Sequence, residues 1–251
     1  MSPSSSQVRK TALNLLRPTS RQGWLRLPED RQADQAVKPP PYLPIYEKLL
    51  APLRRRSFAL LELGVWNGHS LEMWRDAFPR ATIIGVDLQP PDMELGPRVH
   101  IIEGDQTDAA LMQRLRDEHA PVGFDVIIDD ASHLGLITAR SVQALYAQHL
   151  RPGGLYCIED WGTGYLLDWP DGGPMATPLD VRSLDAVPAP GEAGELPMPS
   201  HDLGVVGVIK RLLDHTAGGT VRFAQPDAAG EILDIESMSV WDGIVALRKP
   251  A

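Results

Sequence analysis

Short apolar runs alternate with longer segments of helical character over most of the chain, and this pattern constrains the fold more than any other feature. The five runs are residues 58–63, 82–87, 99–102, 124–129 and 154–159. The segments between them are long enough to hold crossover helices, which parallel strands need for their connections. The alternation therefore predicts a doubly wound α/β fold around a mostly parallel sheet.

Further signals place the remaining elements around this sheet. A helix is expected over about 45–55, and an amphipathic helix follows residue 204, where apolar residues recur at helical spacing. Residues 151–154, Arg-Pro-Gly-Gly, predict a helix stop and a turn. Two last apolar runs, 232–240 and 243–248, indicate an antiparallel hairpin that closes the sheet as its sixth and seventh strands.

Composition limits the class of protein. A chain of 251 residues is more typical of one large domain than of two. A net charge of −9 and a pI of about 5.2 argue against nucleic acid and anionic membranes as partners. The single cysteine, Cys157, lies in an apolar run, which indicates a buried side chain and a reducing cytoplasm. No apolar stretch has the length of a signal peptide or a membrane span, so a cytoplasmic protein is expected.

Two segments depart from the alternating pattern. Residues 1–41 are polar and proline-rich, and we interpret them as an N-terminal arm or cap on a domain that covers 42–251. Glycine and proline supply 14 of the 43 residues from 162 to 204. Long irregular insertions of this kind are usually functional or disordered. Because the segment directly follows the fifth run, a lid over the site is favoured over a surface insertion.

Pairs of adjacent acids end the fourth and fifth apolar runs: Asp129 with Asp130, and Glu159 with Asp160. Ligands of a parallel sheet bind beyond the carboxyl ends of its strands. If these strands are neighbours, about 4.8 Å apart, up to four carboxylates meet at one edge of the sheet. Such carboxylates repel one another, and a bound hard cation is the simplest way to hold them together. The pattern predicts an oxygen-ligated metal.

The turn after the first run favours a bound cofactor. Gly64 and Gly68 would let a ligand approach the backbone, and Ser70 could cap the helix that follows. The turn suits a nucleotide-like molecule, although Trp66 stands where a dinucleotide-binding turn has its second glycine. A nicotinamide dehydrogenase is therefore disfavoured.

Acids also follow the first three runs in order, as Glu62, Asp87 and Asp105. An acid in the position of Asp87 commonly accepts hydrogen bonds from ribose hydroxyls. Asp105 and Gln106 could face an adenine, whereas the alternative for Asp105 alone is ordinary turn chemistry. The ordered set of three indicates a nucleoside-containing cofactor.

Taken together, these segments resemble class I S-adenosylmethionine-dependent methyltransferases. The resemblance is carried by Glu62-Leu63-Gly64, Asp87, Gly104-Asp105-Gln106, Asp129-Asp130-Ala131-Ser132-His133 and Ile158-Glu159-Asp160. More narrowly, the chain is similar to magnesium-dependent O-methyltransferases that modify deoxysugars of macrolide antibiotics. This group is linked to the cephalosporin hydroxylase or rhamnosyl O-methyltransferase family. The likeness runs from about Tyr42 to Lys249, and Ala131 departs from the glycine common at that place.

The resemblance assigns roles to individual residues. It implies that Asp130, Glu159 and Asp160 bind Mg²⁺, and that His133, beside Asp130, is the general base. Magnesium prefers oxygen ligands and rarely takes imidazole, which agrees with a histidine next to the metal and not on it. The implied contacts of S-adenosylmethionine are Glu62, Gly64, Trp66, Asn67, Ser70, Asp87, Leu88, Gly104, Asp105, Gln106 and Asp129.

The expected activity is metal-dependent O-methylation of a hydroxyl on a sugar or a glycosylated small molecule. Methylation of a catechol-like phenol and a non-catalytic cofactor-binding scaffold are the alternatives. Trp161, Tyr165 and Trp169 could form an aromatic wall for the acceptor or anchor the lid, and His69 and His201 are expected to be non-catalytic. The sequence is compatible with a homo-oligomer.

Overall fold

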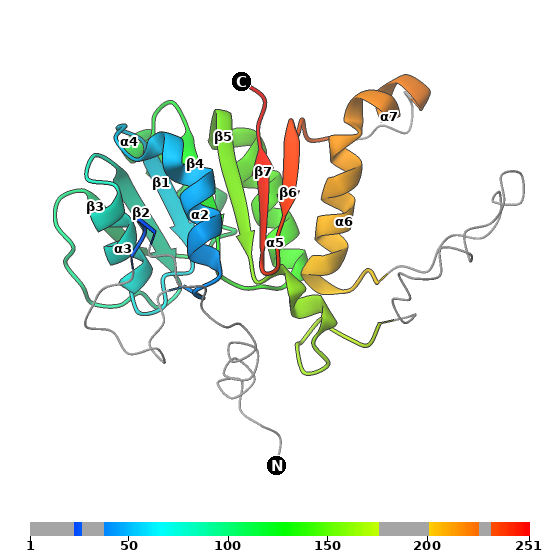
Figure 1. Ribbon diagram of the computed structural model, residues 1–251, viewed down its shortest axis with the longest axis horizontal. Helices are drawn as coiled ribbons and strands as arrows, with labels where there is room; N and C mark the ends of the chain where they lie inside the picture. The colour runs from blue at the N-terminus through cyan, green and yellow to red at the C-terminus, as the bar shows by residue number, and fades with distance from the viewer. Residues whose placement is uncertain (1–22, 27–37, 176–200, 226–231) are drawn as a thin grey trace, which may run out of the picture.

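The centre of the molecule is a seven-stranded sheet with the strand order β3-β2-β1-β4-β5-β7-β6 (Figure 1). The computed structural model describes residues 23–26, 38–175, 201–225 and 232–251. The strands are β1 (Ala59–Leu63), β2 (Thr82–Asp87), β3 (Val99–Glu103), β4 (Phe124–Asp129), β5 (Leu150–Glu159), β6 (Ser237–Val240) and β7 (Ile244–Arg248). Strands β1 to β5 pair in parallel, whereas β7 pairs antiparallel with both β5 and β6. The predicted mostly parallel sheet with a C-terminal hairpin is confirmed.

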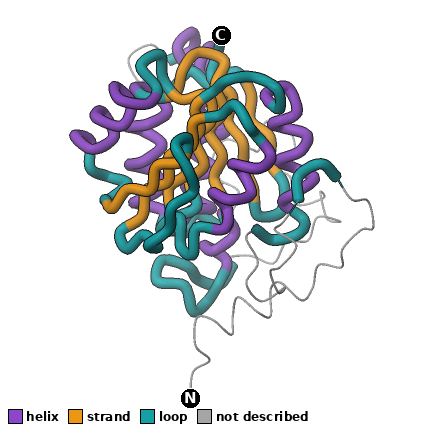
Figure 2. Tube along the Cα trace, turned by 90° about the vertical axis from the view of Figure 1, so that its left-hand side faces the viewer, coloured by secondary structure: helices purple, strands orange, loops and turns teal. Residues whose placement is uncertain are grey.

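Helices cover both faces of this sheet, as Figure 2 shows edge-on. They are α2 (Tyr42–Leu50), η2 (Ala51–Leu53), α3 (His69–Ala77), α4 (Ala109–His119), α5 (Gly135–Ser141), η3 (Val142–Tyr146), η4 (Trp161–Tyr165), α6 (Gly204–Thr216) and α7 (Gly218–Ala224). The apolar residues of α2 and α3 pack on one face, and those of α4, η3 and α6 pack on the other. The result is a three-layer sandwich.

The central strands are mostly apolar because both of their faces are covered. In β1, Leu60 faces the layer of α2 and α3, while Leu61 faces the layer of α4 and η3, and both are fully buried. Strands buried on both sides read as continuous apolar runs, which is why the sequence marked them clearly. Cys157 is buried in β5, as expected. Among the described residues, no helix is both long enough and apolar enough to span a bilayer.

The expected turn at 151–154 is wrong, because these residues lie inside β5. Leu150 pairs with Phe124 and Leu155 pairs with Val126, so the intervening residues of β5 form a bulge opposite Asp125. Arg151 Nη1 lies 3.0 Å from Asp125 Oδ1, and this ion pair ties the bulge to β4. Proline and glycine here mark an irregular strand start. Most of the predicted lid, 176–200, falls outside the described residues.

The strand order reverses between β1 and β4, because β1 has β2 on one side and β4 on the other. Open α/β sheets bind their ligands at such a switch point, beyond the carboxyl ends of the strands. Leu63 pairs with Asp129, and Asp129 pairs with Ile158, so β1, β4 and β5 finish nearly level. The fold therefore presents the acids that follow these strands at one edge.

We expect Leu61→Ala to lower the free energy of unfolding by about 2–5 kcal/mol, because it leaves a cavity in a fully buried strand. The matched control is Leu136→Ala, whose side chain is 63% exposed, and its effect should stay within about 0.5 kcal/mol. Urea denaturation followed by circular dichroism measures both. Equal effects of the two variants would contradict the burial described here.

Candidate functional site

Carboxylates gather where β1, β4 and β5 end, but the set differs from the expected one. Glu62, Asp130, Glu159 and Asp160 converge, whereas Asp129 points to the other face of β4 and accepts hydrogen bonds from Tyr156 Oη and Gln106 Nε2. Successive side chains of a strand alternate between its faces, so Asp129, the last residue of β4, faces away from the carboxylate cluster. Asp160 follows β5 with a left-handed φ of 51°, and this turn lets it lie on the same side as Glu159. Burial raises the pKa of Asp129 to about 6.

A lysine ammonium lies among three of these acids. Lys38 Nζ is 2.6 Å from Asp130 Oδ2, 2.8 Å from Glu62 Oε1 and 2.9 Å from Glu159 Oε1, and the lysine side chain is 1% exposed. Burial alone would lower the pKa of Lys38, but Asp130, Glu159 and Glu62 together hold it well above its ordinary value. The ammonium stays charged and offsets the carboxylates. We call Glu62, Asp130 and Glu159 the inner cluster.

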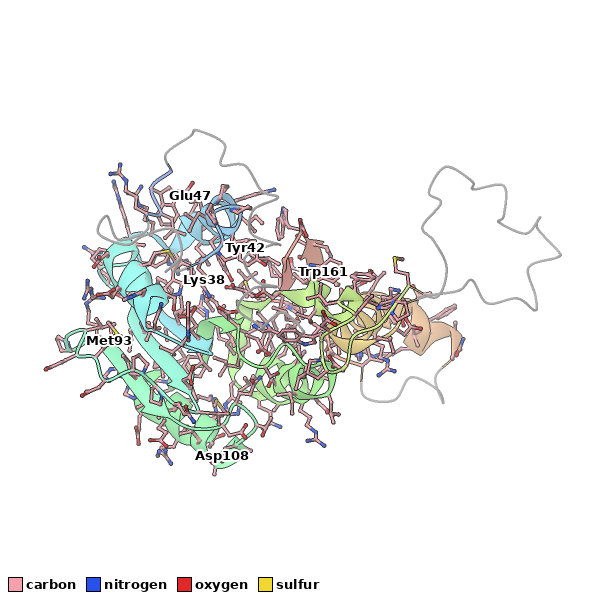
Figure 3. All side chains as sticks on the ribbon, turned by 90° about the horizontal axis from the view of Figure 1, so that it is seen from below. Lys38, Tyr42, Glu47, Met93, Asp108 and Trp161 are labelled. Carbon is pink, nitrogen blue, oxygen red and sulfur yellow. The ribbon has the colours of Figure 1, made fainter. Side chains whose placement is uncertain are left out.

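Helix α2 adds two tyrosine hydroxyls to the same acids. Tyr46 Oη donates a hydrogen bond to Glu159 Oε1, and Tyr42 Oη donates one to Asp160 Oδ1; the distance between donor and acceptor is 2.5 Å in both. Figure 3 looks at this end of the sheet and labels Lys38 and Tyr42 beside it. Burial raises the pKa of both tyrosines, so their hydroxyls remain proton donors. Sequence analysis missed this role of Lys38, Tyr42 and Tyr46. The spacing of four residues places the two tyrosines on one face of α2, whereas Lys38 precedes the helix.

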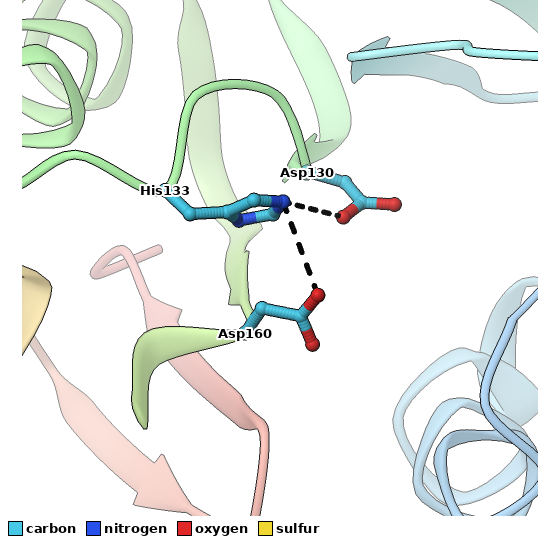
Figure 4. Close-up of side chains that lie close together, drawn as sticks. All are labelled: Asp130, His133 and Asp160. Atoms are coloured by element: carbon cyan, nitrogen blue, oxygen red, sulfur yellow. Dashed lines mark ion pairs between the residues drawn. The ribbon is translucent and has the colours of Figure 1, made fainter. Parts of the chain in front are cut away.

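An outer cluster of Asp130, His133 and Asp160 lies beside the inner one (Figure 4). His133 Nε2 is 3.6 Å from Asp130 Oδ1 and 3.9 Å from Asp160 Oδ2. The carboxylate side chains are 24% and 41% exposed, so this cluster is open to a ligand in a way that the inner one is not. Asp130 belongs to both clusters and contributes a different oxygen to each.

His133 is held by the segment that follows β5. Its backbone φ is 51°, in the left-handed region, and its carbonyl oxygen accepts hydrogen bonds from Trp169 Nε1 at 2.9 Å and Thr163 Oγ1 at 3.1 Å. Trp161 Nε1 donates to the carbonyl of Trp241 at 2.8 Å. The two tryptophans therefore act as anchors of this segment. His69 and His201 instead contact Glu72 and the Gly164 carbonyl.

The turn after β1 is shaped by close backbone contacts. Gly64 has φ +83°, and a Cβ at this position would lie 2.2 Å from the carbonyl oxygen of Asp130. The expected capping of α3 by Ser70 is wrong, because Gly68 occupies the N-cap and Ser70 lies within the helix. Its hydroxyl donates to Glu62 Oε2 at 2.8 Å. The serine thus positions an acid of the inner cluster.

Asp87 fixes the same turn from β2. Its Oδ2 accepts hydrogen bonds from the backbone N–H groups of Val65 and Trp66, and its Oδ1 accepts one from Gln89. Burial would raise the pKa of Asp87, but these three donors bring it below its ordinary value. The carboxylate is ionised and oriented. Trp66 and Leu88 flank it and are 63% and 66% exposed, which leaves apolar surface at the edge of the turn.

The remaining predicted cofactor residues divide into two groups. Asp105 is exposed, with Oδ1 bound to the backbone N–H and hydroxyl of Thr107, and these bonds lower its pKa. Asn67 Oδ1 accepts a hydrogen bond from the backbone N–H of His69. Gln106 instead turns inward, where its Nε2 donates to Ser141 Oγ at 2.7 Å and to Asp129. Gly104 packs tightly against Leu111, with no room for a Cβ.

The predicted metal ligands are thus divided between the two clusters: Glu159 lies in the inner one, Asp160 in the outer one, and Asp130 in both. Carboxylate oxygens of this kind are the ligands that Mg²⁺ prefers. The residues present therefore fit a divalent ion, and the full ligand set remains a prediction.

We expect Gly64→Ala to destabilise the fold by more than Gly96→Ala. Both glycines have φ above +80°, which costs alanine about 1–2 kcal/mol, but only the added methyl at Gly64 meets a backbone atom, since the space around Gly96 is open. Urea denaturation compares the two variants. Equal losses would show that the contact between Gly64 and Asp130 does not restrict the turn.

Several of the curated proteins that the chain resembles are O-methyltransferases of sugars on natural products. The chain is 38% identical over 146 residues to mycinamicin VI 2''-O-methyltransferase of Micromonospora griseorubida, covering 55% of this chain and 35% of that protein. It is 35% identical over 155 residues to demethylmacrocin O-methyltransferase of Streptomyces fradiae, covering 58% of this chain and 38% of that protein. The chain therefore spans little more than a third of the length of these curated relatives. No protein-family model matches it.

A solved structure gives the same result at the level of the fold. The methyltransferase MycE of the mycinamycin biosynthetic pathway, in complex with Mg and SAH, superposes with a TM-score of 0.63 at 29% identity. The match covers 83% of this chain and 49% of MycE. The resemblance to S-adenosylmethionine-dependent sugar and macrolide O-methyltransferases, first indicated by the sequence, is confirmed as a similarity.

Proposed function

We propose that this chain is an S-adenosylmethionine- and Mg²⁺-dependent O-methyltransferase that acts on a hydroxyl of a sugar or glycosylated natural product. The observation that carries the proposal is the outer cluster, in which His133 lies within 4 Å of two accessible carboxylates beyond a sheet switch point. Relatives whose names specify sugar-modifying O-methyltransferases, and a structural neighbour bound to Mg and SAH, support the same chemistry.

In this proposal the turns after β1, β2 and β3 bind S-adenosylmethionine. Asp87, ionised and fixed by three backbone donors, is suited to the ribose hydroxyls. Exposed Trp66 and Leu88 offer apolar surface for a base, and Asp105 is accessible near them. Gln106 is more suited to orienting Asp129 than to touching the cofactor, because its amide is already bound inside the fold.

Asp130, Glu159 and Asp160 are proposed to hold the divalent ion. When bound, Mg²⁺ supplies Lewis acidity that makes an acceptor hydroxyl easier to deprotonate. His133 Nε2 faces the space between Asp130 and Asp160, and it would take the proton of that hydroxyl. The oxygen would form its bond to the methyl carbon as the bond between that carbon and the sulfonium sulfur breaks, so that S-adenosylhomocysteine leaves as the neutral thioether. The carboxylates fix the acceptor and Trp169 and Thr163 fix the histidine backbone, so the chain contributes mainly orientation.

The proposed partner is a small molecule, because a net charge of −9 disfavours nucleic acid and anionic membranes. A single buried cysteine is in keeping with a reducing cytoplasm. A catechol-like phenol would use the same cluster, but the relatives with printed sugar substrates favour a glycosylated acceptor. A scaffold without catalysis has no use for a histidine placed between two accessible carboxylates.

We expect His133→Ala to lower kcat by about 10²–10⁴-fold with a glycosylated macrolide acceptor, since general-base catalysis contributes this much. The matched control is His119→Ala, at the end of α4, which should keep wild-type turnover. Methyl transfer from radiolabelled S-adenosylmethionine provides the measurement. EDTA should abolish transfer, and added Mg²⁺ should restore it.

Calorimetry separates cofactor binding from catalysis. Micromolar binding of S-adenosylmethionine to the wild type and to His133→Ala would support the proposal. If the wild type does not bind the cofactor at all, the proposal is wrong. If it binds and transfers the methyl group equally well in EDTA, the enzyme is metal-independent and only the fold-level conclusion stands.

A further inference from the structure

We propose that Lys38 is a built-in cation that fills the inner cluster, so that the protein binds one divalent ion where a chain without this ammonium binds two. The inference rests on the metal dependence in the proposed function and adds a role for a residue of the N-terminal segment. It starts from the two overlapping clusters, each of which brings ligand atoms within 4.8 Å of one another.

The inner cluster already binds a cation with suitable chemistry. An ammonium carries three donors, and three carboxylates surround this one at 2.6–2.9 Å, the range of charge-assisted hydrogen bonds. Glu62 Oε1 is buried without a hydrogen bond of ordinary geometry, and Lys38 Nζ faces it at 2.8 Å. This oxygen therefore relies on a positive charge and not on a directional donor.

The burial of the cluster makes a cation necessary. The side chains of Glu62 and Glu159 are 0% and 1% exposed, so water cannot compensate their charges. Leaving one buried charge without its partner is strongly destabilising. Removal of Lys38 would leave three carboxylates in a space that suits a divalent ion. Uptake of an ion from solution is the direct way to restore the balance.

Asp130 contacts a different group with each of its two carboxylate oxygens, as a carboxylate does when it bridges two metal ions. Asp130 uses Oδ2 for Lys38 and directs Oδ1 toward His133 in the outer cluster. In sites with two metal ions, carboxylates commonly bridge cations that lie about 3.5–4 Å apart. Lys38 thus occupies the place of a second cation, and Asp130 Oδ1 and Asp160 stay available to the catalytic ion, with Glu159 shared between the two cations as in the proposed ligand set.

The chain holds this ammonium in place from several points. Tyr42 and Tyr46, four and eight residues further on, bind Asp160 and Glu159. The backbone N–H of Tyr42 also donates to the carbonyl of Pro39, next to Lys38, at 2.8 Å. Because this cation is covalently part of the chain, it cannot dissociate at low metal concentration. The inner cluster is therefore compensated whether or not Mg²⁺ is bound.

The test counts bound metal in three proteins: wild type, Lys38→Met and Lys38→Arg. Each is dialysed to equilibrium against Mn²⁺, and the metal is measured by plasma mass spectrometry with electron paramagnetic resonance of the same samples. We expect one ion in the wild type and one in Lys38→Arg, which keeps the charge. Lys38→Met should bind two, and its spectrum should show magnetic coupling between neighbouring Mn²⁺ ions.

A double variant locates the additional ion. Glu62→Gln in the Lys38→Met background removes a ligand of the inner cluster, so the count should return to one. If Lys38→Met folds only in excess Mn²⁺, that dependence itself supports the proposal. Lys38→Gln serves as a second uncharged variant, and it should also bind two ions.

The outcomes separate this inference from the proposed function. A count of one in both wild type and Lys38→Met would overturn the role of Lys38 and leave the metal-dependent enzyme intact. A count of two in the wild type would also overturn it, because the inner cluster would accept an ion beside the lysine. A change from zero to one on removal of Lys38 would overturn both, because the lysine would then occupy the single metal site and the wild type would bind no ion.

Discussion

Repulsion among the carboxylates at the ends of β1, β4 and β5 is the constraint on which the arrangement of this end of the molecule depends. The strand register brings Glu62, Asp130 and Glu159 together, and their burial removes the water that would screen them. Lys38 and the hydroxyls of α2 supply the missing positive charge and donors. The start of α2 is therefore part of the site and not a separate cap over it.

The order of the strands determines which part of the site each strand carries. At the switch point, β1 and β2 shape the turn proposed to bind a nucleoside, while β4 and β5 lead into the acids and the histidine. Asp87 illustrates how local backbone donors prepare a charged group: three N–H groups fix the carboxylate before any ligand arrives. The antiparallel β7 packs against β5 and brings Trp241, whose carbonyl accepts from Trp161. Each neighbouring strand thus fixes one part of the site.

The sequence alone was sufficient to place strands that are buried on both faces and therefore mostly apolar, as in β2 and β4, whose bounds match the prediction. It was sufficient for the acids that follow these strands, but not for the direction in which they point: Asp129 turns away because strand side chains alternate. Lys38 could not be assigned, since a lysine in a proline-rich segment reads as solvated until α2 is packed on the sheet. The bulge at 151–154 was mistaken for a turn because both use proline and glycine.

The contact between Gly64 and the carbonyl of Asp130 joins two loops that sequence analysis treated separately. The backbone N–H of Asp130 also donates to the carbonyl of Leu63 at 2.9 Å, so the two loops meet through both the N–H and the carbonyl of Asp130. With no side chain between them, neither loop can shift without moving the other. Binding of a ligand at one loop is then thermodynamically linked to binding at the other. The linkage is reciprocal: if the first ligand changes the affinity for the second by some factor, the second ligand changes the affinity for the first by the same factor.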